Sequence, residues 1–163
     1  MSALPAVGIG YDSHRFAPGR PLVLGGLTIP HEQGLAGHSD GDAVCHAITD
    51  ALLGAAGLGD IGAHFPPDDE RWRDADSLAL LRRVVVLLGE RALVAGNVDV
   101  TVVCEAPRLG PHREPMRARL ADALGIEPER VSVKGKTNEG RGWIGRGEGI
   151  AVMAVVLVVA TGA

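Results

Sequence analysis

Asp12 and His14 stand two positions apart, directly after a short segment, Ala6–Tyr11, that is predicted to be a β-strand. In extended backbone, residues i and i+2 point to the same side, so a carboxylate and an imidazole can converge on one cation. His46 lies in a segment with helical periodicity, and two histidines with one carboxylate are a common catalytic zinc set. An Asp-x-His pair also arises by chance, and a histidine in a helix is usually a core or surface residue. Together the three residues predict a divalent metal site.

Asp42 and Asp50 lie one helical turn before and after His46, so all three share one helix face. The two carboxylates could be further metal ligands or partners that orient the imidazole ring. The remaining histidines stand in loops rich in proline and glycine, and we interpret them as surface residues without a role: His31, His64 and His112.

Three other polar segments could bind an anion. The loop His38–Asp42 leads into a predicted helix, whose free amides suit a phosphate, although plain capping by Asp40 or Asp42 is the simpler interpretation. Asp60–Gly62 is a turn that could bind a hydroxyl group. Lys134–Glu139 follows a strand and could hold a diphosphate with a magnesium ion, or be an ordinary charged hairpin end. Arg146, in a glycine-rich turn, is free to meet an anion.

Composition excludes several classes of function. A net charge of −4 and an aromatic content of 3% argue against nucleic-acid binding, which needs a basic face or stacking platforms. Two cysteines do not form a disulfide framework, and no signal peptide is visible. The longest apolar run, Ile150–Ala160, is far shorter than the roughly 20 residues of a membrane helix. We expect a cytoplasmic protein that binds neither nucleic acid nor membrane.

The 163 residues suit one catalytic domain spanning residues 1–163, of the α+β class, with helices packed on one face of a mixed β-sheet. The last strand is apolar at nearly every position and needs cover on both faces, which suggests an oligomer. The predicted strands are Ala6–Tyr11, a hairpin over Pro21–Ile29, Asn97–Cys104, Val131–Lys134 and Gly149–Val159. The predicted helices are Asp42–Ala56, then Ser77–Glu90 with Asp76 or Ser77 as its N-cap, and Pro111–Leu124 with Gly125 at its end.

The chain resembles the 2-C-methyl-D-erythritol 2,4-cyclodiphosphate synthase family of the non-mevalonate isoprene biosynthesis pathway. The resemblance runs almost end to end and depends on ordered blocks: Gly8–His14, Gly34–Asp42, His46 with Asp50–Gly54, Gly59–Gly62, Gly96–Val100, Lys136–Glu139 and Gly145–Ile150. Three local departures from the usual pattern are Pro67, Lys136 and Trp143, and Arg108 stands where a lysine often lies.

The resemblance implies a homotrimeric phosphorus-oxygen lyase with active sites at subunit interfaces, acting on a cytidine diphosphate-linked small molecule. Zinc, or another divalent metal such as manganese, would bind Asp12, His14 and His46, with magnesium at Glu139. His38 and Thr137 would stabilise the transition state. The implied substrate contacts are Asp12, His14, His38, Ser39, Asp60, Ile61, Gly62, Phe65, Asp69, Cys104, Ala106, Pro107, Arg108, Leu109, Lys136, Thr137, Asn138, Glu139, Trp143 and Arg146. Those from Cys104–Gly110 and Lys136–Thr137 would come from the neighbouring subunit.

The implied reaction is attack of the substrate's own 2-phosphate on its β-phosphate, with release of CMP. A phosphate is largely dianionic at neutral pH and needs no general base, which suits a chain without a recognisable nucleophile set. Two alternatives remain at this stage: a zinc-dependent phosphohydrolase, and a non-catalytic trimer that binds a nucleotide or an isoprenoid.

Overall fold

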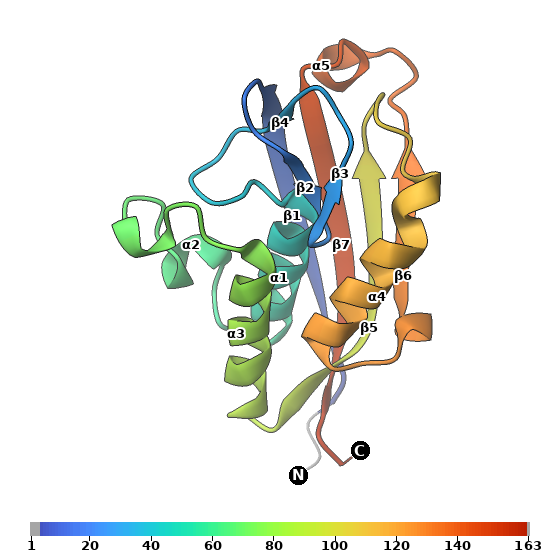
Figure 1. Cartoon of the computed structure of the whole chain (residues 1–163). Helices are drawn as coiled ribbons and strands as arrows, with labels where there is room; N and C mark the ends of the chain where they lie inside the picture. The colour runs from blue at the N-terminus through green and yellow to red at the C-terminus, as the bar shows by residue number, and fades with distance from the viewer. Residues whose placement is uncertain (1–3, 163) are drawn as a thin grey trace.

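The main sheet has five strands in the order β4-β1-β7-β5-β6 (Figure 1). The computed structural model describes residues 4–162. β5 and β6 run parallel, and the other neighbouring strands are antiparallel, so the sheet is mixed. A small hairpin, β2–β3, turns at Gly25 and Gly26 as predicted, both with positive φ. The strands are β1 (Ala6–Ala17), β2 (Leu22–Leu24), β3 (Leu27–Ile29), β4 (Gly34–Leu35), β5 (Leu93–Val103), β6 (Val131–Lys136) and β7 (Gly149–Ala160).

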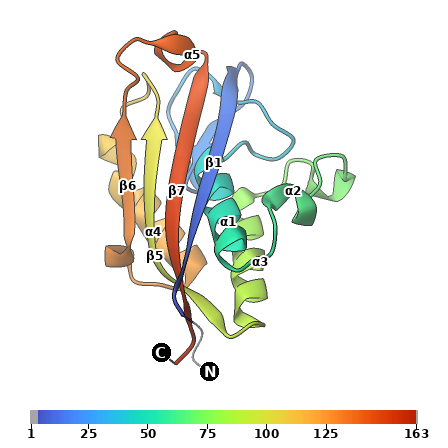
Figure 2. The ribbon, with the colours of Figure 1, turned by 180° about the vertical axis from the view of Figure 1, so that it is seen from behind.

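Among residues 4–162, the three long helices cover one face of this sheet, and Figure 2 shows that none of the helices in this range lies on the other face. The predicted α+β class, with helices on one face of a mixed sheet, is thereby confirmed. The helices are α1 (Ala43–Ala55), α2 (Ile61–His64), α3 (Ser77–Gly89), α4 (Arg113–Leu124) and α5 (Gly142–Gly145), with 3₁₀ turns at Glu70–Trp72, Gly110–His112 and Pro128–Arg130. Within residues 4–162, no helix has the length and apolar character that crossing a bilayer requires.

Helix α1 lies directly on β1 because two glycines of the strand face it. A Cβ atom on Gly10 would stand 1.8 Å from the carbonyl oxygen of Ala47, and one on Gly8 would stand 1.9 Å from that of Ala51. Only a strand without side chains at these points allows the two backbones to approach so closely. This contact brings His46, on α1, beside the polar end of β1.

The uncovered face of the sheet is apolar along β1 and β7. Ile9 is 71% exposed and Met153 is 43% exposed, and Val7, Tyr11 and Val155 are exposed beside them. These residues are cross-strand neighbours, because Ile9 pairs with Val155 and Tyr11 pairs with Met153. A contiguous apolar surface of this kind is typical of an interface with another molecule.

Several predicted boundaries were wrong. β1 does not end before Asp12 but continues to Ala17, because β7 pairs with it as far as Gly149 and β4 follows on its other edge. β5 begins at Leu93 instead of Asn97, across an irregularity in its register with β7. Cys104 lies beyond the end of β5.

The helix starts also differ from the predictions. Asp42 caps α1 from outside, with its side chain accepting a hydrogen bond from the Cys45 amide. Pro111 lies in the preceding 3₁₀ turn, so α4 begins two residues later, at Arg113. Asp76, one of the two residues predicted as the N-cap of α3, occupies that position, and Gly125 ends α4 in left-handed backbone as predicted.

Candidate metal centre and substrate cavities

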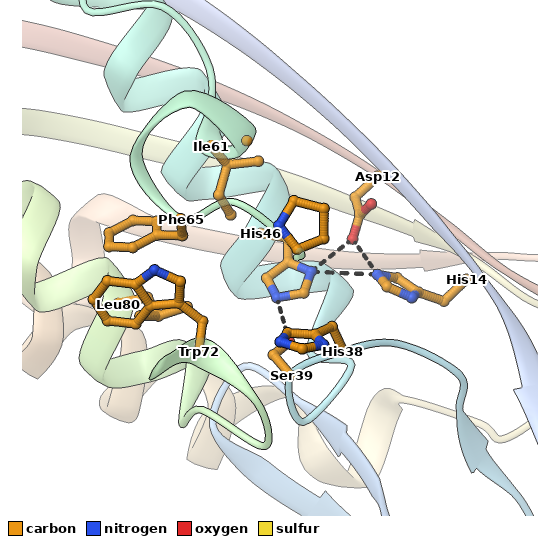
Figure 3. A pocket seen from close by; sticks show the side chains of 11 residues that line it. Asp12, His14, His38, Ser39, His46, Ile61, Phe65, Trp72 and Leu80 are labelled. Carbon is orange, nitrogen blue, oxygen red and sulfur yellow. Dashed lines mark hydrogen bonds and ion pairs between the residues drawn. The ribbon is translucent and has the colours of Figure 1, made fainter. Parts of the chain in front are cut away.

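Asp12, His14 and His46 meet at the polar end of β1 (Figure 3). The strand passes through Asp12 and His14, and both side chains point to the side of the sheet that α1 covers. The Nε2 atom of His14 lies 2.8 Å from Oδ2 of Asp12, and Nδ1 of His46 lies 3.1 Å from the same oxygen. The two imidazole nitrogens are 3.3 Å apart. The structure therefore brings together the three residues that the sequence predicted.

These three atoms form a triangle that fits the ligands of one divalent ion. Tetrahedral zinc with bonds of about 2.0–2.1 Å holds its ligand atoms roughly 3.4 Å apart, close to the spacing of this triangle. Two nitrogens and one carboxylate oxygen are a donor set that zinc and similar cations accept. His14 donates its Nδ1 proton to the carbonyl oxygen of Ala36 at 2.5 Å, which leaves the Nε2 lone pair facing the centre of the triangle.

The protein surroundings shift the pKa values of the cluster in opposite directions. Burial by itself raises the pKa of Asp12, but its hydrogen bonds and charge interactions with His14 and His46 outweigh this effect, so the pKa is lowered. Burial lowers the pKa of His14, and its contacts with Asp12 outweigh burial and raise the pKa. In the absence of a metal, the cluster thus favours an ionised Asp12 beside a protonated His14.

Asp42 and Asp50 are neither ligands nor partners of His46, and this part of the prediction was wrong. Asp42 is fully buried, and its carboxylate accepts hydrogen bonds from the Gly25, Gly26 and Cys45 amides at 2.7–3.0 Å. As the N-cap of α1, Asp42 points toward the β2–β3 hairpin and away from His46. Asp50 accepts from the amide of Ile61 at 3.0 Å and so holds the start of α2.

A cavity of about 250 Å³, which we call the metal cavity, opens beside the three residues. His38 and Ser39 line one side of it, and the Nε2 atom of His38 lies 3.3 Å from the carbonyl oxygen of Asp69. Phe65 and Trp72 form an apolar wall, with their rings edge to face at 5.0 Å. The predicted residues that line the metal cavity are Asp12, His14, His38, Ser39, His46, Ile61, Gly62 and Phe65.

Asp60 lies at a neighbouring cavity of about 320 Å³ that shares Asp12 and His46 with the first. Its carboxylate caps α2 by accepting from the Ala63 amide at 2.9 Å. The predicted turn at Asp60–Gly62 is therefore the start of a short helix that faces both cavities.

A third hollow of about 420 Å³, which we call the β6 cavity, lies where β5 and β6 end. Its lining has three basic residues, Arg108, Arg113 and Lys136, against one acidic residue, Glu105, and this net positive charge suits a diphosphate. Burial raises the pKa of the Cys104 thiol at this cavity to about 11, so the thiol stays neutral at physiological pH. The predicted residues that line the β6 cavity are Cys104, Pro107, Arg108, Leu109, Lys136 and Thr137.

The remaining predicted residues line neither of these two cavities. Asp69 pairs with Arg71 at the surface, and Arg146 pairs with Glu148 at 2.5 Å. Glu139 is exposed and accepts a hydrogen bond from Thr137 at 3.2 Å. The other three are Ala106, Asn138 and Trp143.

Sequence reasoning missed residues whose role depends on packing. Trp72 and Leu80 complete the metal cavity together with Pro67, which the sequence singled out only as a departure from the family pattern, and Ser77 lies beside His46. Arg20 donates to the carbonyl oxygens of Gly37 and Ser39, on either side of His38. The capping pattern before α3 was the one available signal for Ser77, and it indicated a helix start.

The fold and the site together define a class of protein: an α+β domain with an Asp-His-His set that could hold a metal ion and that opens onto a cavity. The YgbB family matches residues 6–159 of the chain, and the chain belongs to this family. It is 59% identical over 152 residues to the 2-C-methyl-D-erythritol 2,4-cyclodiphosphate synthase of Symbiobacterium thermophilum, covering 93% of this chain and 97% of that protein.

A second relative, the synthase of the same name from Gemmatimonas aurantiaca, is 56% identical and matches 99% of this chain and 98% of its own length. A solved structure of 2C-methyl-D-erythritol-2,4-cyclodiphosphate synthase in a CDP-bound form superposes with a TM-score of 0.85 at 41% identity, covering 93% of this chain and 99% of that chain. The resemblance inferred from the sequence motifs is thereby confirmed.

Proposed function

We propose that this chain converts 4-diphosphocytidyl-2-C-methyl-D-erythritol 2-phosphate to 2-C-methyl-D-erythritol 2,4-cyclodiphosphate and CMP. One observation carries the proposal. Asp12, His14 and His46 form a triangle that could hold a metal ion beside the metal cavity, in a chain that matches two synthases of this name over 93% and 99% of its length. The CDP in a related structure supports a substrate with a cytidine diphosphate group.

The proposed step is an intramolecular displacement at phosphorus. An oxygen of the 2-phosphate forms a bond to the β-phosphorus, and the bond from that phosphorus to the oxygen bridging it to the α-phosphate breaks. The bridging oxygen leaves with its electron pair as part of CMP. Because the second pKa of a phosphate is about 6, the nucleophile is largely ionised at neutral pH and no side chain need remove a proton.

The main difficulty of this step is that two anionic groups must approach each other. When bound, zinc at Asp12, His14 and His46 and magnesium at Glu139 would neutralise charge on the phosphates. His38 and Thr137 would donate hydrogen bonds to the reacting phosphate, and the apolar wall formed by Phe65 and Trp72 would help to exclude water once substrate is bound. Because attack is intramolecular, orientation of the substrate alone can contribute roughly 7–11 kcal/mol.

We further propose a homotrimer in which the metal cavity of one subunit meets the β6 cavity of its neighbour. β7 and β5 lie between β1 and β6, and strands about 4.8 Å apart separate β1 from β6 by roughly 14 Å. His38 and Thr137 line different cavities, so a reaction that uses both favours contributions from two subunits. The apolar face along β1 and β7 is a suitable surface for this assembly.

Phosphorus NMR of the protein with substrate, zinc and magnesium tests the proposal. We expect signals of the cyclic diphosphate and of CMP in equal amounts, and none of the cyclic product after chelation of the metals. Linear hydrolysis products would overturn the proposal in favour of a phosphohydrolase. Binding of CMP without turnover would show a protein that binds nucleotides and is not an enzyme.

A further inference from the structure

The two ring nitrogens of His46 face different groups. Nδ1 points to Asp12 and His14, and Nε2 points the opposite way, to the hydroxyl of Ser39 (Figure 3). The hydroxyl of Ser77 also lies at Nε2. Oγ of Ser77 lies 2.9 Å from Nε2, and Oγ of Ser39 lies 3.1 Å from it. A cation in the triangle takes the lone pair of Nδ1, so the ring proton must be on Nε2. His46 therefore has to donate a hydrogen bond to these oxygens.

Ser77 is prepared to accept that hydrogen bond. It is the first residue of α3 and is fully buried. Its hydroxyl donates to Oδ1 of Asp40, and its backbone amide donates to Oδ2 of the same carboxylate at 3.0 Å. Because the carboxylate takes the hydroxyl proton, the Ser77 oxygen faces His46 with a lone pair. The bonds run in one direction, from His46 to Ser77 and from Ser77 to Asp40.

Ser39 differs from Ser77 in this respect. Its hydroxyl has two further contacts, with the Gly41 amide and with Oγ of Ser77, and both are 3.4 Å long. Among the contacts of the described residues, no carboxylate receives the Ser39 proton, so this hydroxyl can turn toward the metal cavity that it lines. Two serines at similar distances from one ring nitrogen are thus expected to have different effects on the metal.

We propose that Ser77 and Asp40 are positioning residues for the metal centre, which hold His46 as an Nδ1 ligand and strengthen its binding to the cation. Partners of this kind fix the tautomer and ring orientation of a ligating histidine and increase its basicity. The inference deepens the proposed function and rests on its metal site. It also connects the metal ligand to the start of α3, an element with no other contact to the metal triangle among the interactions described above.

The test compares Ser77→Ala with Ser39→Ala, a matched loss of one hydroxyl beside the same nitrogen. Affinity for Zn²⁺ is measured by competition with a chelator, and the coordination is followed in the visible spectrum of the Co²⁺ form. We expect Ser77→Ala to weaken Zn²⁺ binding about 10–100-fold and to change the Co²⁺ bands. Ser39→Ala is expected to keep the parent affinity within about threefold and the parent spectrum, since its proton is not part of the chain of bonds.

Asp40→Asn provides a second variant if Ser77→Ala fails to fold, because it keeps the size of the side chain and removes its charge. Asp40→Asn is expected to weaken Zn²⁺ binding as well. Ser77→Thr keeps the hydroxyl, so it is expected to keep the Zn²⁺ affinity that Ser77→Ala loses.

Parent affinity and spectrum in the folded Ser77→Ala or Asp40→Asn protein would overturn the inference, as would equal losses in the two serine variants. These measurements do not depend on turnover, so a protein that forms no cyclic product would refute the proposed reaction alone. A parent chain that binds neither Zn²⁺ nor Co²⁺ would refute both.

Discussion

The metal cavity and the β6 cavity differ in how completely one chain builds them. At the metal cavity, both imidazoles and the carboxylate contact each other and further groups of the same chain. At the end of β6, Thr137 and Glu139 contact one another, and both are exposed together with Lys136. The first region is organised by burial under α1, whereas the second lies beyond the end of an edge strand.

This difference suggests that residues of the metal cavity hold the metal and residues at the end of β6 bind the substrate. Groups that hold a metal must keep their geometry within fractions of an ångström, and rigid elements with supporting hydrogen bonds achieve this. Groups that meet a flexible diphosphate can be ordered by the substrate and by a neighbouring subunit. Substitutions in the two regions should therefore fail in different ways.

The largest effect is expected from His46→Ala. The variant leaves two ligands, so we expect Zn²⁺ binding to be lost. The turnover rate should fall by at least about 10²-fold. Nucleotide binding at the β6 cavity should persist, because that cavity shares no residue with the metal cavity. Metal analysis, phosphorus NMR and calorimetry with CDP measure the three quantities. Retained metal with a near-normal rate would refute the ligand assignment.

Glu139→Gln should also lose turnover but, unlike His46→Ala, should retain Zn²⁺. Co-expression of His46→Ala and Glu139→Gln chains then tests whether two subunits share a site. If they do, random mixing leaves one interface in four with both halves intact, and about a quarter of the parent rate returns. Each variant alone is the control. No recovery in verified mixed trimers would show that both halves come from one subunit.

Gly10→Ala tests the close contact that organises the metal cavity. The added methyl group meets the carbonyl of Ala47, so the helix must move, and we expect a loss of about 1–3 kcal/mol in the free energy of unfolding, together with weaker metal binding. Gly54→Ala, on the helix α1 that carries Ala47, is the control, because nothing lies within 4 Å of its added Cβ. It should stabilise the chain by about 0.5–1 kcal/mol. Denaturant titration measures both, and equal effects would contradict this account.

The metal-free protein should show a pH dependence that originates in the metal cluster. Because the pKa of Asp12 is lowered in the folded protein, this group contributes stability that is present above pH 3.8, its pKa in the unfolded chain. The contribution is lost as the pH falls through the pKa of the folded state. The raised pKa of His14 contributes stability that is present below 6.5 and is lost as the pH rises through its folded value. The difference in unfolding free energy between the parent and Asp12→Asn should thus be largest between pH 3.8 and pH 6.5. A difference that stays constant with pH would contradict the pairing.

The smallest effect is expected from Asp69→Asn, outside both cavities. Its carboxylate pairs with Arg71 on the surface, where ion pairs contribute little to stability. The arginine keeps the pKa of Asp69 below its usual value, but solvent screens the pair. The unfolding free energy should be unchanged within error in denaturant titration. A rise in KM without loss of stability would support the predicted contact of Asp69 with substrate.

Much of the fold was predictable because it follows from local patterns. Alternation and β-branched residues marked the strands, and the caps at Asp76 and Gly125 marked helix ends. The errors concern boundaries that depend on partners. β1 extends through Asp12 because β7 and β4 pair with it, and a strand's end is determined by its neighbours in the sheet.

The amino-acid sequence by itself predicted the candidate ligand set, and residue type with an i, i+2 spacing in extended backbone accounts for Asp12 and His14 on one side of the strand. The third member, His46, reaches them only because α1 packs closely on β1. Only the tertiary structure decided which groups support that set. Asp42, on the predicted face of His46, turned to the β2–β3 hairpin, and Ser77, 31 residues away from His46 along the chain, took the position beside its ring. Hydrogen-bond partners of buried groups depend on which elements pack together, and helix periodicity describes only one element at a time.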